Sequence, residues 1–504
     1  MKKLMALLAF SGVLFISCSD DDNSSTDPED GIPENPIEYT SGSADLSTFV
    51  SLGNSVTAGV SDQALFIKGQ EASFPNMLAG SFAQAGGGDF TIPFMADDLG
   101  GLTLGGMPIT PNRLILDFST GSPLPTEVEG TPTTEVTNIL SGPFNNMGVP
   151  LAKSYHLLAE GYGSVAGVQP GLANPFFARF ASSPATTILG DALAQSPTFF
   201  TLWVGSNDVL GYATSGGTGI DQTGNIDPGT YASNDISDPN VVAGSVDGIL
   251  KALTAAGAKG VVANIPDVTK IPFFTAVPHN PVPLDQATAD FLNSPLAYGA
   301  YNAGIQQLAG LGLISAEEAA RRTISFSAGE GNAVVILDED LTDLTGFNPA
   351  LINIRQTTAE DLLVFTSSTF IGTPAVPGDP NSINGVAVPL ADQWVLTPEE
   401  QQAVQTATAA YNATIEGLAQ IYDLAFVDID AFYNLVETEG IPLSDGSVVT
   451  DDYAVGGGFS LDGLHPTPRG SALIANEFIK AIEAKYGAVL PRIDPLAYTG
   501  LYIN

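Results

Sequence analysis

Near-continuous apolar runs recur along the chain, each bounded by glycine or aspartate. They lie at 48–53, 198–205, 260–265 and 424–430, and read TFVSLG, TFFTLWVG, GVVANI and LAFVDID. Runs that do not alternate between apolar and polar residues are typical of parallel strands buried on both faces of a sheet. The pattern therefore predicts strands of a buried parallel sheet.

Apolar residues at helical spacing fill the stretches between these strands. One helical segment begins at Ser73 and ends in glycines, and another begins at Asp238. The clearest helix begins at Thr397, because Pro398 suits the first helical position and Glu400 can complete a capping box. Strands that alternate with helices predict a three-layer α/β/α sandwich with a mostly parallel sheet, in which ligands bind at the carboxyl ends of the strands.

Two long stretches interrupt this alternation, at 86–143 and 271–396, the second with a helical pattern near 285–322. Segments this long usually carry function or structure of their own, so we expect insertions that border the site. The catalytic domain is then expected to span 47–487, and 488–504 to form a C-terminal tail.

The first 17 residues have the pattern of an export signal. Lys2 and Lys3 precede an apolar run that is too short to remain as a membrane span. The LFISC segment ends at Cys18 and resembles a bacterial lipoprotein cleavage box, with Phe15 where that family usually has leucine. The resemblance implies lipidation of Cys18. A plain secretory signal followed by a coincidental cysteine remains the alternative.

Residues 18–46 are acidic, polar and rich in turn formers, which predicts a flexible tether. The acidic run directly after Cys18 resembles the surface-export signals of Bacteroidetes lipoproteins. A solvated spacer that shares the acidity of the whole protein accounts for it equally well.

Composition narrows the class of protein. The 504 residues are 44% hydrophobic and only 14% charged, with abundant glycine and proline, which indicates a globular protein with long loops. The net charge is −39 and no basic cluster occurs, so a nucleic-acid partner is excluded. With a single cysteine, no intramolecular disulfide can form.

A serine follows the first predicted strand. Ser55 comes directly after Gly53 and Asn54, where the carboxyl edge of a sheet would present its hydroxyl. Gly-Asn-Ser is also a common turn composition, so this placement alone is weak evidence. Near the other end of the chain, Asp462 precedes His465 by three residues. That spacing lets the carboxylate accept from one ring nitrogen while the other faces the serine.

Two further histidines compete for the role of base. His156 is expected on a helix surface or in the core, and His279 in a loop between prolines. Acyl transfer also needs donors for a developing oxyanion. The candidates that follow strands are the backbone N–H groups of Ser55 and Gly148 and the side-chain amide of Asn207.

Four segments, GNSVTAG, NMGVP, GSND and DGLH, resemble in order the four blocks of the SGNH (GDSL-type) hydrolases. The resemblance implies a flavodoxin-like sandwich and an ester-hydrolysing serine enzyme. It also implies the residue roles. Ser55 would be the nucleophile, His465 the general base and Asp462 the carboxylate that orients it. The oxyanion donors would be Ser55, Gly148 and Asn207. Asn54 stands where the family usually has aspartate, and we expect a modest weakening of activity from that change.

The leading hypothesis is a lipid-anchored esterase or lipase of the cell envelope, in the outer membrane, acting through an acyl-enzyme on a small-molecule, glycan or lipid ester. No cofactor or metal is expected, because the chain lacks HExxH and any Cys/His cluster. The alternative is a non-catalytic glycan- or lipid-binding surface lipoprotein. An α/β-hydrolase is disfavoured because no GxSxG elbow surrounds a serine at a strand end. The aromatic pairs at 176–177 and 273–274 could line an acyl pocket, although such pairs more often belong to the core.

Overall fold

The computed structural model describes residues 37–119, 124–379 and 382–503. The predicted signal 1–17, the lipidation site Cys18 and most of the predicted tether lie outside these residues. Tyr39–Asn504 forms one compact unit. Among the described residues, none of the helices combines the length and the apolar character needed to cross a membrane.

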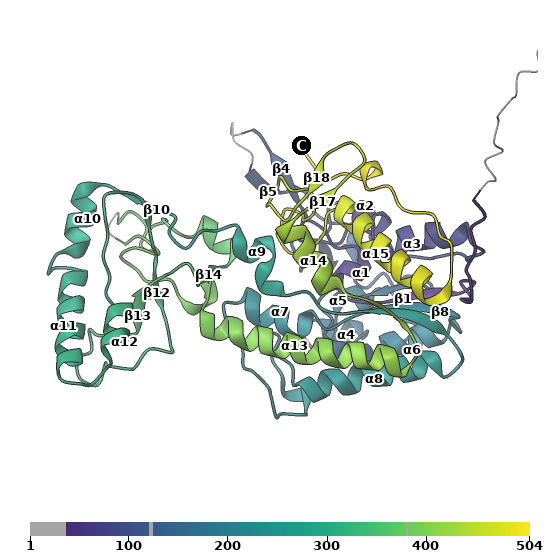
Figure 1. Ribbon diagram of the computed structural model, residues 1–504, viewed down its shortest axis with the longest axis horizontal. Helices are drawn as coiled ribbons and strands as arrows, with labels where there is room; N and C mark the ends of the chain where they lie inside the picture. The colour runs from purple at the N-terminus through teal and green to yellow at the C-terminus, as the bar shows by residue number, and fades with distance from the viewer. Residues whose placement is uncertain (1–36, 120–123, 380–381, 504) are drawn as a thin grey trace, which may run out of the picture. The chain divides into compact units, whose positions relative to one another are not determined.

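A five-stranded, all-parallel sheet lies at the centre of the fold (Figure 1). Its strands are β1 (Phe49–Gly53), β7 (Asn146–Gly148), β8 (Phe199–Trp203), β9 (Lys259–Ala263) and β16 (Ala425–Val427). Their spatial order is β16-β9-β8-β1-β7. Numbered along the chain this is the order 2-1-3-4-5 of flavodoxin-like sheets, in which the strand order reverses beside the first strand. The predicted α/β/α class is confirmed.

Helices cover both faces of the sheet, with α3 and α15 on one face and α8 and α13 on the other (Figure 1). The larger helices of this unit are α3 (Phe74–Ala83), α6 (Ile188–Leu193), α7 (Asn207–Thr214), α8 (Pro239–Thr254), α13 (Pro398–Ile421), α14 (Ile429–Thr438) and α15 (Pro468–Tyr486). Thr397 and Glu400 form the predicted capping box at the start of α13. The short helices are α1 (Ser55–Ala58), α2 (Ile67–Glu71), α4 (Val165–Val168), α5 (Pro175–Ala178) and α9 (Pro272–Thr275).

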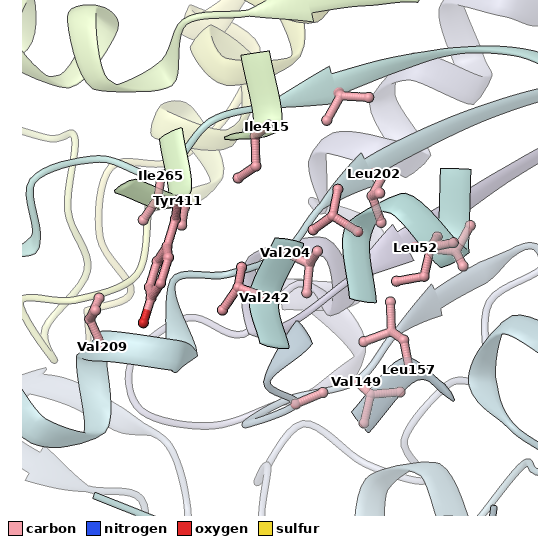
Figure 2. Close-up of a cluster of buried hydrophobic side chains, with 14 of the residues drawn as sticks. Leu52, Val149, Leu157, Leu202, Val204, Val209, Val242, Ile265, Tyr411 and Ile415 are labelled. Carbon is pink, nitrogen blue, oxygen red and sulfur yellow. The ribbon is translucent and has the colours of Figure 1, made fainter. Parts of the chain in front are cut away.

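The strands supply two separate cores because successive side chains point to opposite faces. Phe199 of β8 packs in the core with α3 and α15, whereas Phe200 packs in the core with α8 and α13. Figure 2 shows the second core, where Leu202 of β8 lies among side chains that include Val242 of α8 and Ile415 of α13. Burial on both faces explains why the strands are apolar without alternation.

Both predicted insertions carry structure of their own. The first contains β2 (Leu102–Leu104), β3 (Met107–Pro108), β4 (Leu114–Asp117), β5 (Leu124–Glu127) and β6 (Thr134–Glu135). The second contains β10 (Val282–Leu284), β11 (Gly329–Asn332), β12 (Val335–Leu337), β13 (Ile354–Gln356), β14 (Leu362–Leu363) and β15 (Val395–Leu396). It also has a hydrophobic core built from residues of 277–395 alone. The remaining hairpin pairs β17 (Ile441–Pro442) with β18 (Val448–Val449).

The helical pattern near 285–322 forms three helices rather than one, namely α10 (Gln286–Asn293), α11 (Tyr298–Gly310) and α12 (Ala316–Arg321). Pro295 prevents a continuous helix between the first two. Gly312, in the left-handed region at φ +73°, terminates α11.

Both ends of the described chain pack on the domain. Thr40 and Val489 exchange backbone hydrogen bonds of 3.0 and 2.8 Å, and Ser43 N–H donates to the Tyr486 carbonyl. The folded unit therefore begins before the predicted tether boundary at residue 46. The expected C-terminal tail is also attached, because the Tyr502 ring contacts Phe66 edge-on.

Candidate active site

The corner after β1 presents Ser55 at the first position of α1. Gly53 is required there, since an added Cβ would lie 2.1 Å from Thr57 Oγ1 and 2.5 Å from the Trp203 carbonyl oxygen. The Asn54 side chain accepts a hydrogen bond of 3.3 Å from the Val56 N–H and caps the helix. The amide therefore supplies local support at the position where the resembled family has aspartate.

Ser55, His465 and Asp462 form one continuous hydrogen-bonded chain. Ser55 Oγ lies 2.9 Å from His465 Nε2, and His465 Nδ1 lies 2.8 Å from Asp462 Oδ2. Asp462 Oδ1 also accepts from the N–H groups of Leu464 and His465, at 2.8 and 2.9 Å. Burial alone would raise the pKa of Asp462, but the adjacent His465 and these hydrogen bonds lower that pKa to about 2. The carboxylate is thus ionised and fixes the ring, which is the arrangement a general base needs.

The turn at Asp62 and Gln63, which the sequence analysis did not predict, supports the Asp462 carboxylate. The Gln63 N–H donates to Asp462 Oδ2 at 2.7 Å, while Asp62 accepts from the Leu461 N–H and its own N–H donates to Ser460 Oγ. Asp62 and Gln63 both have left-handed backbones, at φ 50° and 65°. Burial raises the pKa of Asp62 to about 7. No glycine marks this turn, so the sequence pattern gave no sign of it.

Asn207 is held as an oxyanion donor would be. It begins α7 directly after β8, and its Nδ2 donates to the Ala152 carbonyl at 3.0 Å. That bond uses one amide hydrogen and leaves the second one for a ligand. The backbone N–H of Ser55 has no hydrogen-bond partner within the described residues. Both groups lie on the same cavity as His465.

The structure corrects the prediction for Gly148. Its N–H donates to Asn146 Oδ1 at 2.9 Å, and an added Cβ would lie 2.3 Å from the Ala58 nitrogen, so Gly148 is packed against α1. Leu151 is the better candidate for the third oxyanion donor, because it lines the cavity and its N–H has no hydrogen-bond partner among the described residues. Its φ of 66° is unusual for leucine. Sequence reasoning missed it, since glycine is the residue expected at such a backbone.

A cavity of about 1290 Å³ adjoins Ser55, Asn207 and His465. Its lining comes mainly from 151–175 and 207–245, and among the described residues neither insertion contributes to it. The expectation that the insertions border the site is therefore wrong for this cavity. The apolar side chains that line it include Leu151, Leu158, Tyr162, Leu172, Ile226 and Tyr231.

The other predicted candidates take structural roles. His156 lines the cavity, but its Nδ1 accepts from the Lys153 N–H at 3.0 Å and its ring stacks on Tyr162. Burial lowers the pKa of His156 to about 4, so the ring is neutral. The His279 carbonyl accepts from Thr357 within the second insertion. The aromatic pairs 176–177 and 273–274 are buried in the hydrophobic cores.

Asp208 of the GSND segment holds the wall of the cavity. The carboxylate is fully buried and accepts from the N–H and Oγ of Ser154, at 2.8 and 3.0 Å. Burial raises the pKa of this group, while those hydrogen bonds and the neighbouring Lys153 oppose the shift. Asp208 thereby fixes the segment that carries Leu151 and Ala152 relative to Asn207.

Replacing Asn207 by alanine is expected to lower kcat for ester hydrolysis by roughly 10²- to 10³-fold, because one oxyanion donor is lost. KM for a short ester should change little, since the donor acts mainly on the transition state. Steady-state kinetics measures both constants. Asn240→Ala is the matched control, because Asn240 is exposed at the same cavity and holds no reacting group. Unchanged kcat in Asn207→Ala would remove Asn207 from the oxyanion site.

Comparison with known proteins finds no family model, no curated protein and no solved structure that matches this chain.

Proposed function

We propose that this protein is an SGNH-type serine esterase that hydrolyses carboxylic esters through an acyl-enzyme. The observation that carries the proposal is the unbroken chain from Asp462 through His465 to Ser55, with bonds of 2.8 and 2.9 Å. These groups come from opposite ends of the sequence and meet at the carboxyl edge of the sheet. A purely structural serine and helix cap would not need an ionised carboxylate aligned behind the imidazole.

The geometry supports a two-step reaction. His465 Nε2 accepts the Ser55 proton as Oγ bonds to the ester carbonyl carbon, and the carbonyl oxygen gains the negative charge. Donors from Ser55, Leu151 and Asn207 hold that charge. His465 then protonates the departing alcohol as the ester C–O bond breaks. A water molecule, deprotonated by His465, attacks the acyl-enzyme, and Ser55 regains its proton as the acid leaves.

The cavity supports an ester with a sizeable apolar acyl group. Its volume of about 1290 Å³ exceeds the range of roughly 300–1,000 Å³ usual for small-ligand pockets. Leu172 and Ile226 are 76% and 72% exposed at its lining, so they would be covered by bound substrate. The proposed substrates are therefore acylated lipids, acylated glycans or simple carboxylic esters with an apolar acyl group. Lipidation at Cys18 and a place in the outer membrane of the cell envelope are part of the proposal.

The proposal is tested on the full chain without its signal peptide. We expect hydrolysis of p-nitrophenyl esters, and stoichiometric labelling of Ser55 by a fluorophosphonate, located by peptide mass spectrometry. Absence of both, with retained binding of a lipid or glycan ligand, would favour the non-catalytic binding lipoprotein. Labelling elsewhere in the chain would reject Ser55 as the nucleophile.

Filling the cavity should change acyl-length preference. Gly244 of α8 lines the cavity, and an added Cβ there meets nothing within 4 Å. Gly244→Leu is therefore expected to lower kcat/KM for a long-chain ester about tenfold more than for acetate or butyrate esters, consistent with about 1.4 kcal/mol of lost acyl contact. Gly417→Leu is the control, since Gly417 lies in α13 with equally open space and away from the cavity. An equal effect on both chain lengths would show that the acyl chain binds elsewhere.

A further inference from the structure

Three carboxylates from separate segments converge outside the catalytic cavity. Glu339 follows β12, Asp392 begins the 3₁₀ turn Asp392–Trp394, and Glu400 lies in the first turn of α13. One carboxylate oxygen of each residue lies within 4.8 Å of those of the other two. The first two belong to the second insertion and the third to a helix of the catalytic domain.

Two of these carboxylates carry buried oxygens without a hydrogen bond. Glu400 is only 5% exposed, and its Oε2 accepts from the N–H and Oγ1 of Thr397 at 2.7 and 2.9 Å. Its Oε1 and the Oδ1 of Asp392 are both buried and have no partner. Buried polar atoms are nearly always satisfied in folded proteins, so a missing ligand accounts for this pair better than chance packing.

No basic side chain neutralises this group within the described residues. Arg355 pairs with Asp338 and Asp361, and Arg321 pairs with Asp338 and Glu399. The three carboxylates therefore lie together without a salt bridge to a basic side chain in the described part of the chain.

The neighbouring backbone packs closely against Glu400. Gly216 and Gly217 form a left-handed turn just after α7, at φ 62° and 78°. A Cβ on Gly217 would lie 1.8 Å from Glu400 Oε1, so only glycine lets the chain pass this close to the unpartnered oxygen. Glu339 is exposed, so this member of the cluster is in contact with solvent.

We propose that Glu339, Asp392 and Glu400 bind a divalent cation of the calcium type, which fastens the second insertion to the catalytic domain. The ligand atoms are all carboxylate oxygens, which suit hard cations, and no histidine or cysteine joins the group as zinc or copper would favour. Carboxylates, carbonyls and water can together supply the six to eight oxygens that calcium takes. The ion would lie close to the end of α7, whose first residue is Asn207.

The test uses purified full chain without its signal peptide, first stripped of metal with EDTA. Calcium chloride at about 5 mM, above the roughly 0.1–1 mM dissociation constants of extracellular calcium modules, is expected to raise Tm by about 2–4 °C. Sodium chloride at the same ionic strength should not reproduce the rise. Magnesium should give a smaller one, because it demands stricter octahedral geometry.

Variants then locate the site. Glu400→Gln, Asp392→Asn and Glu339→Gln are each expected to lose most of the calcium response, and isothermal titration should show weakened binding. Glu399→Gln removes the same charge one residue away, at an exposed side chain, and should retain the response. Glu339→Gln keeps the test decisive if the buried variants fold poorly, since that side chain is exposed.

The opposite results overturn the proposal. If calcium does not raise the Tm of the wild type, or if sodium chloride raises it equally, the three carboxylates do not form a calcium site. A full response in Glu339→Gln and Glu400→Gln would place any bound calcium elsewhere. Because the readouts are Tm and calcium binding rather than ester hydrolysis, these outcomes are independent of the proposed esterase activity.

Discussion

Replacing Ser55 by alanine is expected to lower kcat for p-nitrophenyl butyrate hydrolysis by about 10⁴- to 10⁶-fold, since no acyl-enzyme can then form. Stability should hardly change, because Ser55 Oγ makes a single side-chain hydrogen bond, to His465, worth about 1 kcal/mol. Tm and substrate binding measured alongside kcat therefore separate loss of chemistry from loss of folding.

Ser141→Ala provides the matched control for this variant. Ser141 is exposed and lines a different cavity from that of Ser55 and His465, so its removal should leave kcat unchanged. Comparable rates for the wild type and Ser55→Ala would exclude the acyl-enzyme mechanism. A fluorophosphonate that labels Ser55→Ala as fully as the wild type would lead to the same conclusion.

Asp462→Asn is expected to lower kcat by about 10⁴-fold, as in serine hydrolases in which this carboxylate orients the histidine. The wild-type carboxylate accepts hydrogen bonds from His465 Nδ1, Ser460 Oγ and the N–H of Gln63. An amide can accept through only one of its two heavy atoms, so a neighbouring donor loses its partner or the imidazole adopts the wrong tautomer. The lost bonds should also reduce the free energy of unfolding by about 1–3 kcal/mol.

Kinetics and denaturation together test this second prediction. The double variant Ser55→Ala/Asp462→Asn should be no slower than Ser55→Ala alone, because residues that act as one unit are not additive. Asp445→Asn, in an exposed loop, controls for the general effect of removing a carboxylate. Full activity in Asp462→Asn would mean that the backbone alone orients His465.

The fold was predictable because burial on both faces leaves a plain signal. Strands such as β1 and β8 are buried at every position and almost entirely apolar, and the helix after Thr397 carries its complete capping box. The order of the strands was not accessible from the apolar runs alone, since hydrophobicity does not say which strand lies beside which. The three-residue strand β7 is too short for an apolar run to mark it.

The site was predictable where the chemistry demands particular side chains and not where it uses the backbone. Ser55, Asp462, His465 and Asn207 could be chosen from the sequence because few other residues could supply their side-chain functions, and the fold brings them to one cavity or one hydrogen-bonded chain. The N–H of Leu151, our candidate for the third oxyanion donor, belongs to a residue whose type carries no information about such a role. The cluster around Glu400 likewise depends on tertiary contacts between distant acidic residues, in a chain where acidic residues are abundant.

Leu151 combines a main-chain N–H at the proposed oxyanion site with a side chain that lines the cavity. Its amide belongs to the main chain and would persist in every substitution except proline, whereas its side chain is 69% exposed on the cavity. Under the proposed mechanism, substitution of Leu151 would therefore change the cavity lining while keeping the N–H proposed as an oxyanion donor. Glycine there would also release the strain of the left-handed backbone, so Leu151→Gly is the substitution expected to change the cavity lining at the least cost in stability.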